Sequence, residues 1–424
     1  MKGQLIKRGI KSLGSFLSSP VWAYLNDKVE SNGILYYLHG GGVADNTKYI
    51  IAYHLKHAPH IPMRVITPFR TKQIEELESL GIPVCISGNN CEKQFMLSSQ
   101  IVITDHAEWA EGGRFWRFLG KPSVQLWHGV GFKKVGYLAL TGKGDLQKKV
   151  KYLVSKLFRT LEQKYTNTFI VSTSEFYTRV LFSTSFATMS QILPVGNQPR
   201  NDIFFLSDNE IEKVFHKKIY DIGIDYSTIE TIRKVKQEGK KVILLAFTYR
   251  KNKKSVYDNI LSLRKLEDIA SKNNYLFVIK MHPMEEAFYK RKLTSLDNVI
   301  VYHVDGYSDP QPLLREVDAL VTDFSSIYTD FTLMPEKPII FYPYDYDYYN
   351  SSTELGIQLP YNSMTPGPKV QNNEELYKTL NEMLSGNDNY YNERKKFSYL
   401  AFSRHSPVSP LLFNFVKKVI KEGE

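Results

Sequence analysis

Short apolar runs alternate with amphipathic segments along the first half of the chain. Helix-like segments such as TKQIEELESLG, which begins at Thr71, separate several of the runs. The runs are rich in β-branched residues and are short enough for buried strands: ILYYLH from Ile34, RVITPF from Arg64, PVCIS from Pro83, IVITD from Ile101, PSVQLWHG from Pro122, FIVSTS from Phe169 and QILPVGN from Gln191. Because strands that alternate with helices pair in parallel, the pattern predicts a parallel sheet flanked by helices.

The second half of the chain repeats this pattern. Helices are expected in KSVYDNILSLRKLEDIASKN and PQPLLREV. The expected strands are KVILLAFTY from Lys241, YLFVIKMHP from Tyr275, NVIVYHV from Asn298, ALVTDFSS from Ala319 and KPIIFYPY from Lys337. The two halves therefore predict an α/β fold with two Rossmann-like, doubly wound domains facing a central cleft.

The pattern also suggests where the domains begin and end. We expect an N-terminal Rossmann-like domain over residues 31–205, a C-terminal one over 206–395 and closing helices over 396–424. Residues 1–30 are expected to contain an amphipathic helix with lysines and an arginine on its polar side, typical of a helix lying on an anionic membrane. An ordinary capping helix is the alternative, and a second basic amphipathic run at residues 143–165 favours the membrane.

The charge balance favours anionic partners. The chain has 424 residues, with 55 lysines and arginines against 44 acidic residues, and a formal net charge of +11. Phosphorylated substrates, nucleic acid and acidic membrane surfaces all fit this charge. No RNP, zinc-finger or helix-turn-helix signature occurs, so nucleic-acid binding is not expected.

The sequence predicts a cytoplasmic protein that is neither secreted nor integral to a membrane. No apolar run approaches the roughly 18 residues that span a bilayer, and no signal-peptide pattern opens the chain. The two cysteines, Cys85 and Cys91, do not have CxxC spacing. We expect them to be free thiols in a reducing compartment.

Histidines and lysines follow two of the expected strands at their carboxyl ends, where ligands of open α/β sheets bind. His128 lies in LWHGVGFKKVG, a glycine-containing loop that continues into Lys133 and Lys134. His282 lies in KMHP, two residues after Lys280. Each histidine has a structural alternative, that of an imidazole held by hydrogen bonds in the core, but together these loops offer donors and cations to a phosphate.

A third strand runs into VTDFSSIYTDF at residues 321–331. Asp323 ends the strand, Ser325 and Ser326 follow, and the spacing of the apolar residues predicts a helix whose free N–H groups accept a phosphate. A simple N-cap is the alternative. In PVGNQPRND, Arg200 is a candidate phosphate ligand, while the residues after it also fit a turn.

Several other chemistries are excluded by missing motifs. The HGGG at residues 39–42 is similar to an oxyanion loop, but no GxSxG elbow accompanies it, so we expect either a phosphate or substrate loop or a plain turn. No GxxxxGK[ST] loop occurs, which excludes a P-loop enzyme. Asp345 and Asp347 in DYD are more typical of a solvated turn than of a metal site, so no metal is expected.

The order of the motifs resembles the CDP-glycerol glycerophosphotransferase family, which includes the teichoic acid primases and polymerases and their capsule-polymer relatives. The resemblance runs from about residue 41 to about residue 368 and includes NTKYI at residues 46–50. It rests on WHG followed by KK and G (residues 127–136), PRND (199–202), AFTYR (246–250), KMHP (280–283), TDFSSIYTDF (322–331) and PGP (366–368).

The resemblance implies a GT-B architecture with an acceptor-facing N-terminal domain and a C-terminal domain that holds a CDP-linked polyol. It implies attack by an acceptor hydroxyl on the phosphate next to glycerol or ribitol, with release of CMP. The acceptor would be an anionic polymer or a lipid-linked glycan of a teichoic acid or capsule. The enzyme would work at the inner face of the cell membrane, as a peripheral protein on anionic lipid, with no cofactor besides its donor.

The resemblance also suggests roles for the candidate residues. His128 would be the general base, and His282 would contact the donor diphosphate and stabilise the leaving CMP. Lys133 and Lys134 would hold acceptor or phosphate. The remaining residues expected to bind the donor and its phosphates are Arg200, Arg250, Lys280, Asp323, Ser325, Ser326 and Asp330.

The chain also departs from the family pattern. GVGF follows His128 where GTP is common, Lys280 stands in place of arginine, and Phe324 replaces tyrosine. The RHSPVSP near the C-terminus differs as well, so acceptor and donor details stay open. The alternative is a GT-B glycosyltransferase that uses a nucleotide sugar in surface polysaccharide synthesis, since it would have the same fold and phosphate site.

Overall fold

The computed structural model describes residues 13–40, 42–106, 117–118, 121–135, 168–185, 191–250, 256–259, 261–281, 296–351 and 356–422. The chain divides into two compact units. Unit 1 comprises residues 1–128, 135–223 and 403–424, and unit 2 comprises 129–134 and 224–402. Each unit contains one parallel sheet.

Unit 1 is built on a seven-stranded sheet in the order β3-β2-β1-β4-β5-β6-β7, with every pair parallel. All four residues of the central strand β1 are buried, as expected for a strand covered on both faces. The strands are β1 (Ile34–Tyr37), β2 (Met63–Thr67), β3 (Val84–Ile86), β4 (Ile101–Thr104), β5 (Ser123–Gln125), β6 (Thr168–Val171) and β7 (Gln191–Leu193).

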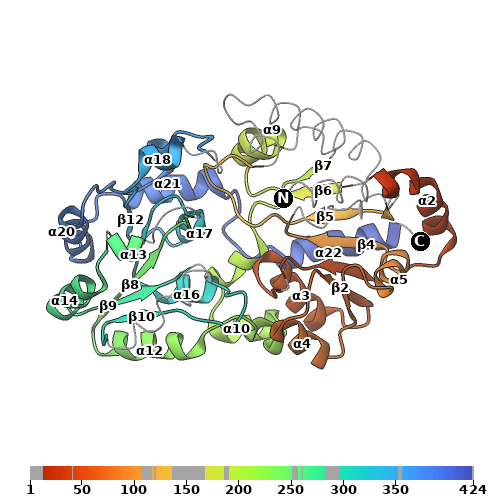
Figure 1. Cartoon of the computed structure of the whole chain (residues 1–424), viewed down its shortest axis with the longest axis horizontal. Helices are drawn as coiled ribbons and strands as arrows, with labels where there is room; N and C mark the ends of the chain where they lie inside the picture. The colour runs from red at the N-terminus through yellow and green to blue at the C-terminus, as the bar shows by residue number, and fades with distance from the viewer. Residues whose placement is uncertain are drawn as a thin grey trace. The chain divides into compact units, whose positions relative to one another are not determined.

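Helices surround this sheet, and α3 packs against β1 while α22 packs against α3 and β4 (Figure 1). α22 begins where the buried Asp202 carboxylate accepts the backbone N–H groups of Val408 and Ser409. The helices of unit 1 are α2 (Ser19–Lys28), α3 (Asp45–His57), α4 (Lys72–Ser79), α5 (Cys91–Ser98), α8 (Glu175–Tyr177), η3 (Thr178–Phe182), α9 (Ser183–Ser185), η4 (Pro199–Phe204), α10 (Asp208–Val214), α11 (Lys217–Asp221) and α22 (Ser409–Glu422).

Unit 2 has a five-stranded parallel sheet in the order β10-β9-β8-β11-β12. Its core is formed by buried residues of the strands and of helices α14 and α20. The strands are β8 (Lys241–Ala246), β9 (Tyr275–Ile279), β10 (Val299–Val301), β11 (Ala319–Thr322) and β12 (Ile339–Phe341). The helices are α12 (Tyr226–Gln237), α13 (Val256–Asn259), α14 (Leu263–Asn273), α16 (Gln311–Glu316), α17 (Ile327–Phe331), α18 (Tyr346–Ser351), α19 (Tyr361–Met364), α20 (Asn373–Leu384) and α21 (Tyr391–Ala401).

Both sheets have the strand order of a Rossmann fold. In each, the first strand lies between its second and fourth strands, so the order reverses between β1 and β4 in unit 1 and between β8 and β11 in unit 2. Ligands of such sheets bind beyond the carboxyl ends of the strands at this reversal point. The prediction of an α/β protein with two Rossmann-like domains is confirmed, and every strand expected from the sequence is present.

The limits of the units differ from the expected ones. Unit 1 continues to Gly223 rather than ending near 205, because the buried Lys48 ammonium of α3 donates to the carbonyl of Ile222 at 2.7 Å and holds this segment. Of the closing helices expected over 396–424, the final helix α22 packs on unit 1. Residues 129–134 join unit 2, and the contacts of this segment are described below.

The expectation of free thiols is wrong. Cys85 at β3 and Cys91 at the start of α5 form a disulfide, because the turn between strand and helix brings their Cα atoms to 5.9 Å. These cysteines therefore do not indicate a reducing compartment. Within the described residues, no helix is both long enough and apolar enough to cross a membrane.

Candidate functional site

Three neighbouring strands of unit 1 each deliver a histidine at the carboxyl edge of the sheet. His39 follows β1, His106 follows β4 and His128 follows β5. Their rings form one stack, with centroids 4.0 Å apart between His39 and His106 and 4.5 Å apart between His106 and His128. The expected loop at residues 39–42 thus contributes an imidazole at the reversal point of the strand order.

His128 is held in one orientation by a backbone carbonyl. Its Nδ1 lies 3.1 Å from the carbonyl oxygen of Asp105. Because a carbonyl oxygen only accepts, Nδ1 carries the proton, and Nε2 is left with the lone pair when the ring is neutral. Burial, together with the positive charge of His106, lowers the pKa of His128 to about 4. The ring is therefore neutral and able to accept a proton at physiological pH.

A strained turn presents His128. Trp127 has a positive φ of 61°, which is rare for a bulky residue, and its N–H donates to the Gln125 side chain at 3.0 Å. The Asn46 amide donates to the Trp127 carbonyl at 2.7 Å. Asn46 belongs to the NTKYI motif, so this motif has a physical role in holding the histidine loop.

Arg200 lies in unit 1 beside this turn. Its guanidinium pairs with Asp45 at 2.5 Å and donates to the His128 carbonyl at 3.2 Å, while its backbone N–H donates to the Asn46 side chain. Burial raises the pKa of Asp45, although Arg200 opposes that effect. The candidate phosphate ligand of the PRND motif is thus placed with the histidine cluster rather than with the unit expected to bind the donor.

The equivalent edge of unit 2 is organised by an arginine between two carboxylates. Arg250, 5% exposed, pairs with Asp323 at 2.7 Å and with Asp345 at 2.9 Å. Burial would lower the pKa of Arg250, but the two carboxylates outweigh it and raise that pKa. Asp323 also accepts the N–H of Thr248 at 2.8 Å. These bonds tie together the loops after β8, β11 and β12.

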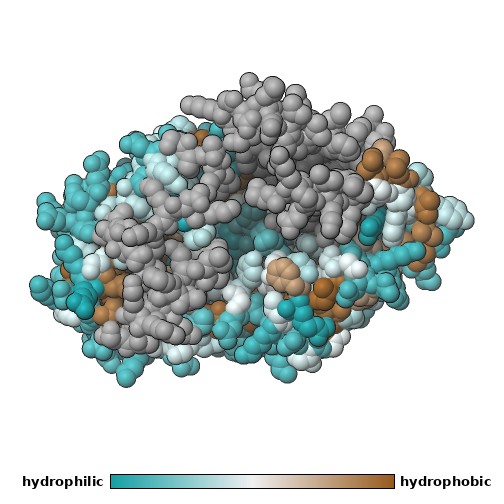
Figure 2. All heavy atoms as spheres, in the orientation of Figure 1, coloured by the Kyte–Doolittle hydropathy of each residue, from teal (hydrophilic) through white to brown (hydrophobic). Residues whose placement is uncertain are grey.

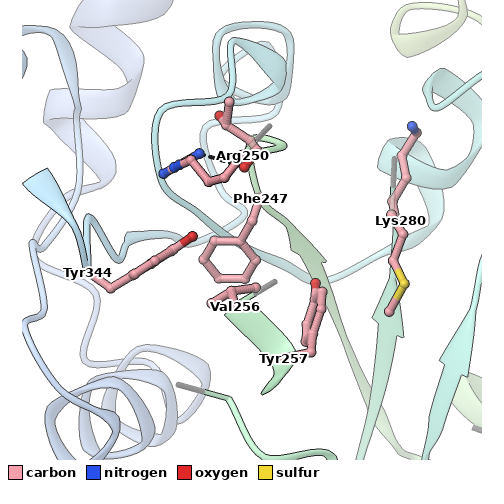
Figure 3. Close-up of a pocket in the computed structure, with 8 residues that line it drawn as sticks. Phe247, Arg250, Val256, Tyr257, Lys280 and Tyr344 are labelled. Carbon is pink, nitrogen blue, oxygen red and sulfur yellow. Dashed lines mark hydrogen bonds between the residues drawn. The ribbon is translucent and has the colours of Figure 1, made fainter. Parts of the chain in front are cut away.

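A small hollow lies beside this cluster in unit 2. Figure 3 shows the rings of Phe247, Tyr257 and Tyr344 around Val256. Arg250 lies above Phe247, and Lys280 lies at the right of the view. Burial lowers the pKa of Lys280. The lining residues are Phe247, Thr248, Arg250, Val256, Tyr257, Lys280, Met281 and Tyr344. Two candidate residues, Arg250 and Lys280, therefore line the same hollow.

The serines expected at a helix start lie close to Asp323. The Ser325 N–H contacts the Asp323 carboxylate at 3.3 Å, and the Ser325 hydroxyl accepts from the N–H of Ile327 at 3.5 Å. The helix that follows, α17, has only five residues, and Ser326 makes no side-chain cap. The helix expected after the serines is therefore present as a short element, and the phosphate role of the serines stays a prediction.

Asp330 is buried in α17, where its carboxylate accepts from the Gln311 amide at 3.1 Å. It is not among the residues that line the hollow. His282 lies outside the described residues, directly after Met281 of the lining. The roles expected of both residues stay predictions.

The lysines after His128 belong to unit 2 by their contacts. The backbone of Lys134 donates to Gly356 at 3.2 Å, and the Phe132 carbonyl accepts from Gln358 at 2.8 Å. The Lys133 ammonium lies 5.9 Å from the centre of the Tyr349 ring. Burial lowers the pKa of Lys133 to about 8, while Asp323 acts in the opposite direction. Lys133 is thus part of the charge cluster of unit 2.

Sequence reasoning missed Asp105, His106 and Asp45, as well as the hydrogen bonds of the Asn46 side chain to Trp127 and Arg200. Asp105 was visible only as the end of the run IVITD, and His106 only as the residue after it, and nothing in their spacing indicated that they lie beside His128. No group of three or more His, Cys, Asp and Glu side chains suitable for a metal ion occurs in the described part of the chain. Asp345, one of the two carboxylates of DYD, is instead engaged by Arg250.

The architecture of two Rossmann-like units, each with polar groups at the carboxyl edge of its sheet, places the protein in the GT-B class. A solved structure of the wall teichoic acid polymerase TagF superposes with a TM-score of 0.70 at 19% identity, covering 99% of this chain and 98% of that one. At that identity, the likeness supports the fold alone. The pattern that defines the family described as CDP-glycerol:poly(glycerophosphate) glycerophosphotransferase matches residues 21–406, so the chain belongs to that family.

The chain is also similar to curated relatives. A teichoic acid glycerol-phosphate transferase of Staphylococcus aureus (strain NCTC 8325 / PS 47) is 27% identical over 294 residues, 65% of each chain. A teichoic acid poly(ribitol-phosphate) polymerase of Bacillus spizizenii (strain ATCC 23059 / NRRL B-14472 / W23) is 27% identical over 267 residues, 61% of this chain and 38% of the relative. The matches thus span only part of the length of these relatives.

Proposed function

We propose that the protein transfers glycerol phosphate or ribitol phosphate from a CDP-polyol to a hydroxyl group of a growing cell-surface polymer. The acceptor oxygen forms a bond to the phosphorus next to the polyol, the bond from that phosphorus to the bridging oxygen breaks, and CMP leaves. The acceptor is a teichoic acid or capsule polymer, or its lipid-linked glycan precursor. Membership of the family and the names of its relatives support this choice.

The observation that carries the proposal is the state of His128. Its Nδ1 donates to a carbonyl, so Nε2 is the basic atom, and burial keeps the ring neutral near pH 7. In the proposed reaction Nε2 takes the proton from the attacking hydroxyl. Proton transfer to a positioned base contributes typically about 10²–10⁴-fold to the rate.

The donor is proposed to bind at the carboxyl edge of the unit 2 sheet. Lys280 and Lys133 supply positive charge there, and the Arg250 charge is already shared with two carboxylates. In the described residues, the buried hydroxyl of Thr248 has no hydrogen-bond partner although it lines the hollow, so it is available to a ligand. The family resemblance adds His282 and the hydroxyls of Ser325 and Ser326 as phosphate ligands. Phosphoryl transfer depends mainly on such positioning and charge.

The test is CMP release by the purified protein with CDP-glycerol and with CDP-ribitol, each with and without a polyol-phosphate or glycan-lipid acceptor. We expect acceptor-dependent CMP from one of the donors. A second candidate, a glycosyltransferase, rests on the shared GT-B fold. Release of a nucleoside diphosphate from a sugar nucleotide, with no CMP from either polyol donor, would favour that candidate and overturn the proposal.

The N-terminal helices support a peripheral position on an anionic membrane. α2 has no buried residues, and Figure 2 shows apolar side chains over it. The exposed apolar residues of this region are Leu13, Phe16, Leu17, Val21 and Tyr24, with 36% to 70% of each exposed. Lys93 and Arg117 lie over the Trp22 ring, which adds positive charge nearby. An apolar stripe beside cations suits the surface of anionic lipid.

Co-sedimentation with lipid vesicles tests the membrane proposal. We expect binding to anionic vesicles, weak binding to zwitterionic ones, and loss of binding in the double variant Leu17→Glu, Val21→Glu. The matched control is Leu411→Glu on α22, where an exposed leucine of unit 1 receives the same change. Equal binding by the double variant and the control would contradict the proposal.

A further inference from the structure

The stack of three imidazoles contains two groups that the proposed reaction does not use. His106 lies between His39 and His128, and its Nδ1 contacts the Asp105 carboxylate at 2.6 Å. The other carboxylate oxygen of Asp105 accepts the N–H of Thr47 at the start of α3, at 3.1 Å. Asp105 is 2% exposed, so its orientation is fixed by these contacts.

We propose that Asp105 and His106 are positioning residues that hold His128 as a neutral base in a single tautomer. The inference rests on the proposed role of His128 as the base. Asp105 acts through two different groups, because its carbonyl accepts from His128 while its carboxylate accepts from His106. One residue therefore fixes the rings of both histidines.

The hydrogen bonds decide which imidazole holds a proton. The Asp105 carboxylate contacts His106 directly, whereas His128 meets only the uncharged carbonyl. A positive charge on His106 is stabilised by its carboxylate partner, and the stacked geometry places this charge 4.5 Å from the ring centre of His128. A second positive charge on the adjacent ring is then unfavourable.

Other charges near His128 act in both directions. Arg200 from η4 adds positive charge, and the Asp45 carboxylate at the start of α3 pairs with that arginine. The Asp105 carboxylate favours a charged His128, but burial and the charge of His106 prevail, so the pKa of His128 is lowered. His39 contacts the far face of His106 and lies one ring further from His128.

The experiment is an NMR titration of the histidine ring nitrogens in ¹⁵N-labelled full-length protein, with the variants His106→Phe and His39→Phe. Phenylalanine keeps a flat ring in the stack but removes the charge and the N–H. For the wild type we expect His128 to remain the Nδ1-H tautomer across about pH 5–8, since its pKa is about 4. In His106→Phe we expect its titration midpoint to rise by about one pH unit or more. His39→Phe should leave that midpoint unchanged.

The acid limb of kcat/KM should rise by the same shift in His106→Phe. An unchanged His128 midpoint in that variant, or an equal shift in His39→Phe, would overturn the proposal. If His106→Phe does not fold, His106→Gln, whose amide can still donate to Asp105, provides the same comparison. The titration needs no substrate, so a protein in which the midpoint shifts as expected, but which never releases CMP, would refute the proposed function and not the positioning role.

Discussion

The carboxyl edges of the two sheets have the same strand order at their reversal points but different chemistry. At the edge of unit 1, three stacked imidazoles follow β1, β4 and β5. At the edge of unit 2, Arg250 follows β8 and pairs with two carboxylates. These are Asp323, which follows β11, and Asp345, which follows β12. In the proposed function, the edge of unit 1 therefore serves proton transfer and the edge of unit 2 serves charge-based binding of the donor.

The strand order is the same at both reversal points, whereas the side chains at the strand ends determine which chemistry is available at each edge. In unit 1, burial makes His128 a neutral base by opposing its positive charge. In unit 2, Arg250 is also buried, yet two carboxylates preserve its charge. If this division is correct, changes in unit 1 should alter turnover, and changes in unit 2 should alter stability and donor affinity.

The largest expected effect is on the stability of unit 2. Arg250→Ala leaves two buried carboxylates without their partner, so the free energy of unfolding should fall by about 3–5 kcal/mol. Denaturant unfolding measures the loss. The matched control is Arg233→Ala, which breaks an exposed pair with Glu316 and should cost at most about 1 kcal/mol. Similar losses in both variants would show that the Arg250 cluster does not hold the loops together.

The next largest effect is expected on turnover, from the loss of the Asn46 side chain that holds the turn at Trp127 and His128. Asn46→Ala removes the donor to the Trp127 carbonyl and the acceptor of the Arg200 N–H. Because His128 then loses its fixed position, we expect kcat to fall about 10–100-fold, in line with the loss of one or two buried hydrogen bonds. Donor affinity, measured by calorimetry, should stay unchanged. A selective loss of donor affinity would place Asn46 with the donor and contradict the division.

A smaller effect is expected from Lys133, which the sequence placed in the N-terminal domain but which belongs to unit 2. Lys133→Ala removes a cation near Asp323 and Tyr349, so the dissociation constant for the CDP-polyol should rise about 10-fold, the value of one charge-assisted hydrogen bond. Lys134→Ala is the neighbouring control and should change donor affinity less. If Lys133→Ala binds the donor normally but has a raised KM for the acceptor, Lys133 contacts the acceptor instead of the donor.

The smallest expected effect is a difference between two pH windows. Donor affinity should fall severalfold as the pH rises through about 8, because Lys133 has a pKa of about 8 and loses its charge there. Turnover at saturating donor should lose activity only as the pH falls towards about 4, where His128 becomes protonated. Donor titrations and initial rates across the same buffers separate the windows. If turnover instead falls on the acid side with a midpoint near pH 6.5, the pKa of His128 is not lowered.

The sequence was sufficient for the strands and for two of the site loops. The strands could be predicted because each is a short buried run bounded by turn residues, and His128 and Asp323 could be placed because both directly follow such runs. The bond from Asp105 to His128 spans 23 residues, and that from Arg250 to Asp323 spans 73. No local spacing encodes such contacts, since they arise only when neighbouring strands align.

Two other differences between the sequence prediction and the structure, at Lys133 and at the cysteine pair, also arise from contacts that local spacing does not encode. Lys133 follows His128 by five positions, so the sequence placed both in the N-terminal half, but backbone bonds to Gly356 and Gln358 attach this segment to unit 2. The pairing of Cys85 with Cys91 likewise depends on how β3 leads into α5. Periodicity reports which residues are buried, and it does not report which loop from another part of the chain lies beside them.

The most direct test of the account is to measure donor binding and acceptor-dependent CMP release on the same preparation of His128→Ala. The account predicts a dissociation constant for the CDP-polyol close to that of the wild type, together with CMP release reduced by about 10²–10⁴-fold, because only the base is removed. CMP release near the wild-type rate, or lost donor binding in a folded variant, would contradict the assignment of the base to unit 1 and of the donor to unit 2.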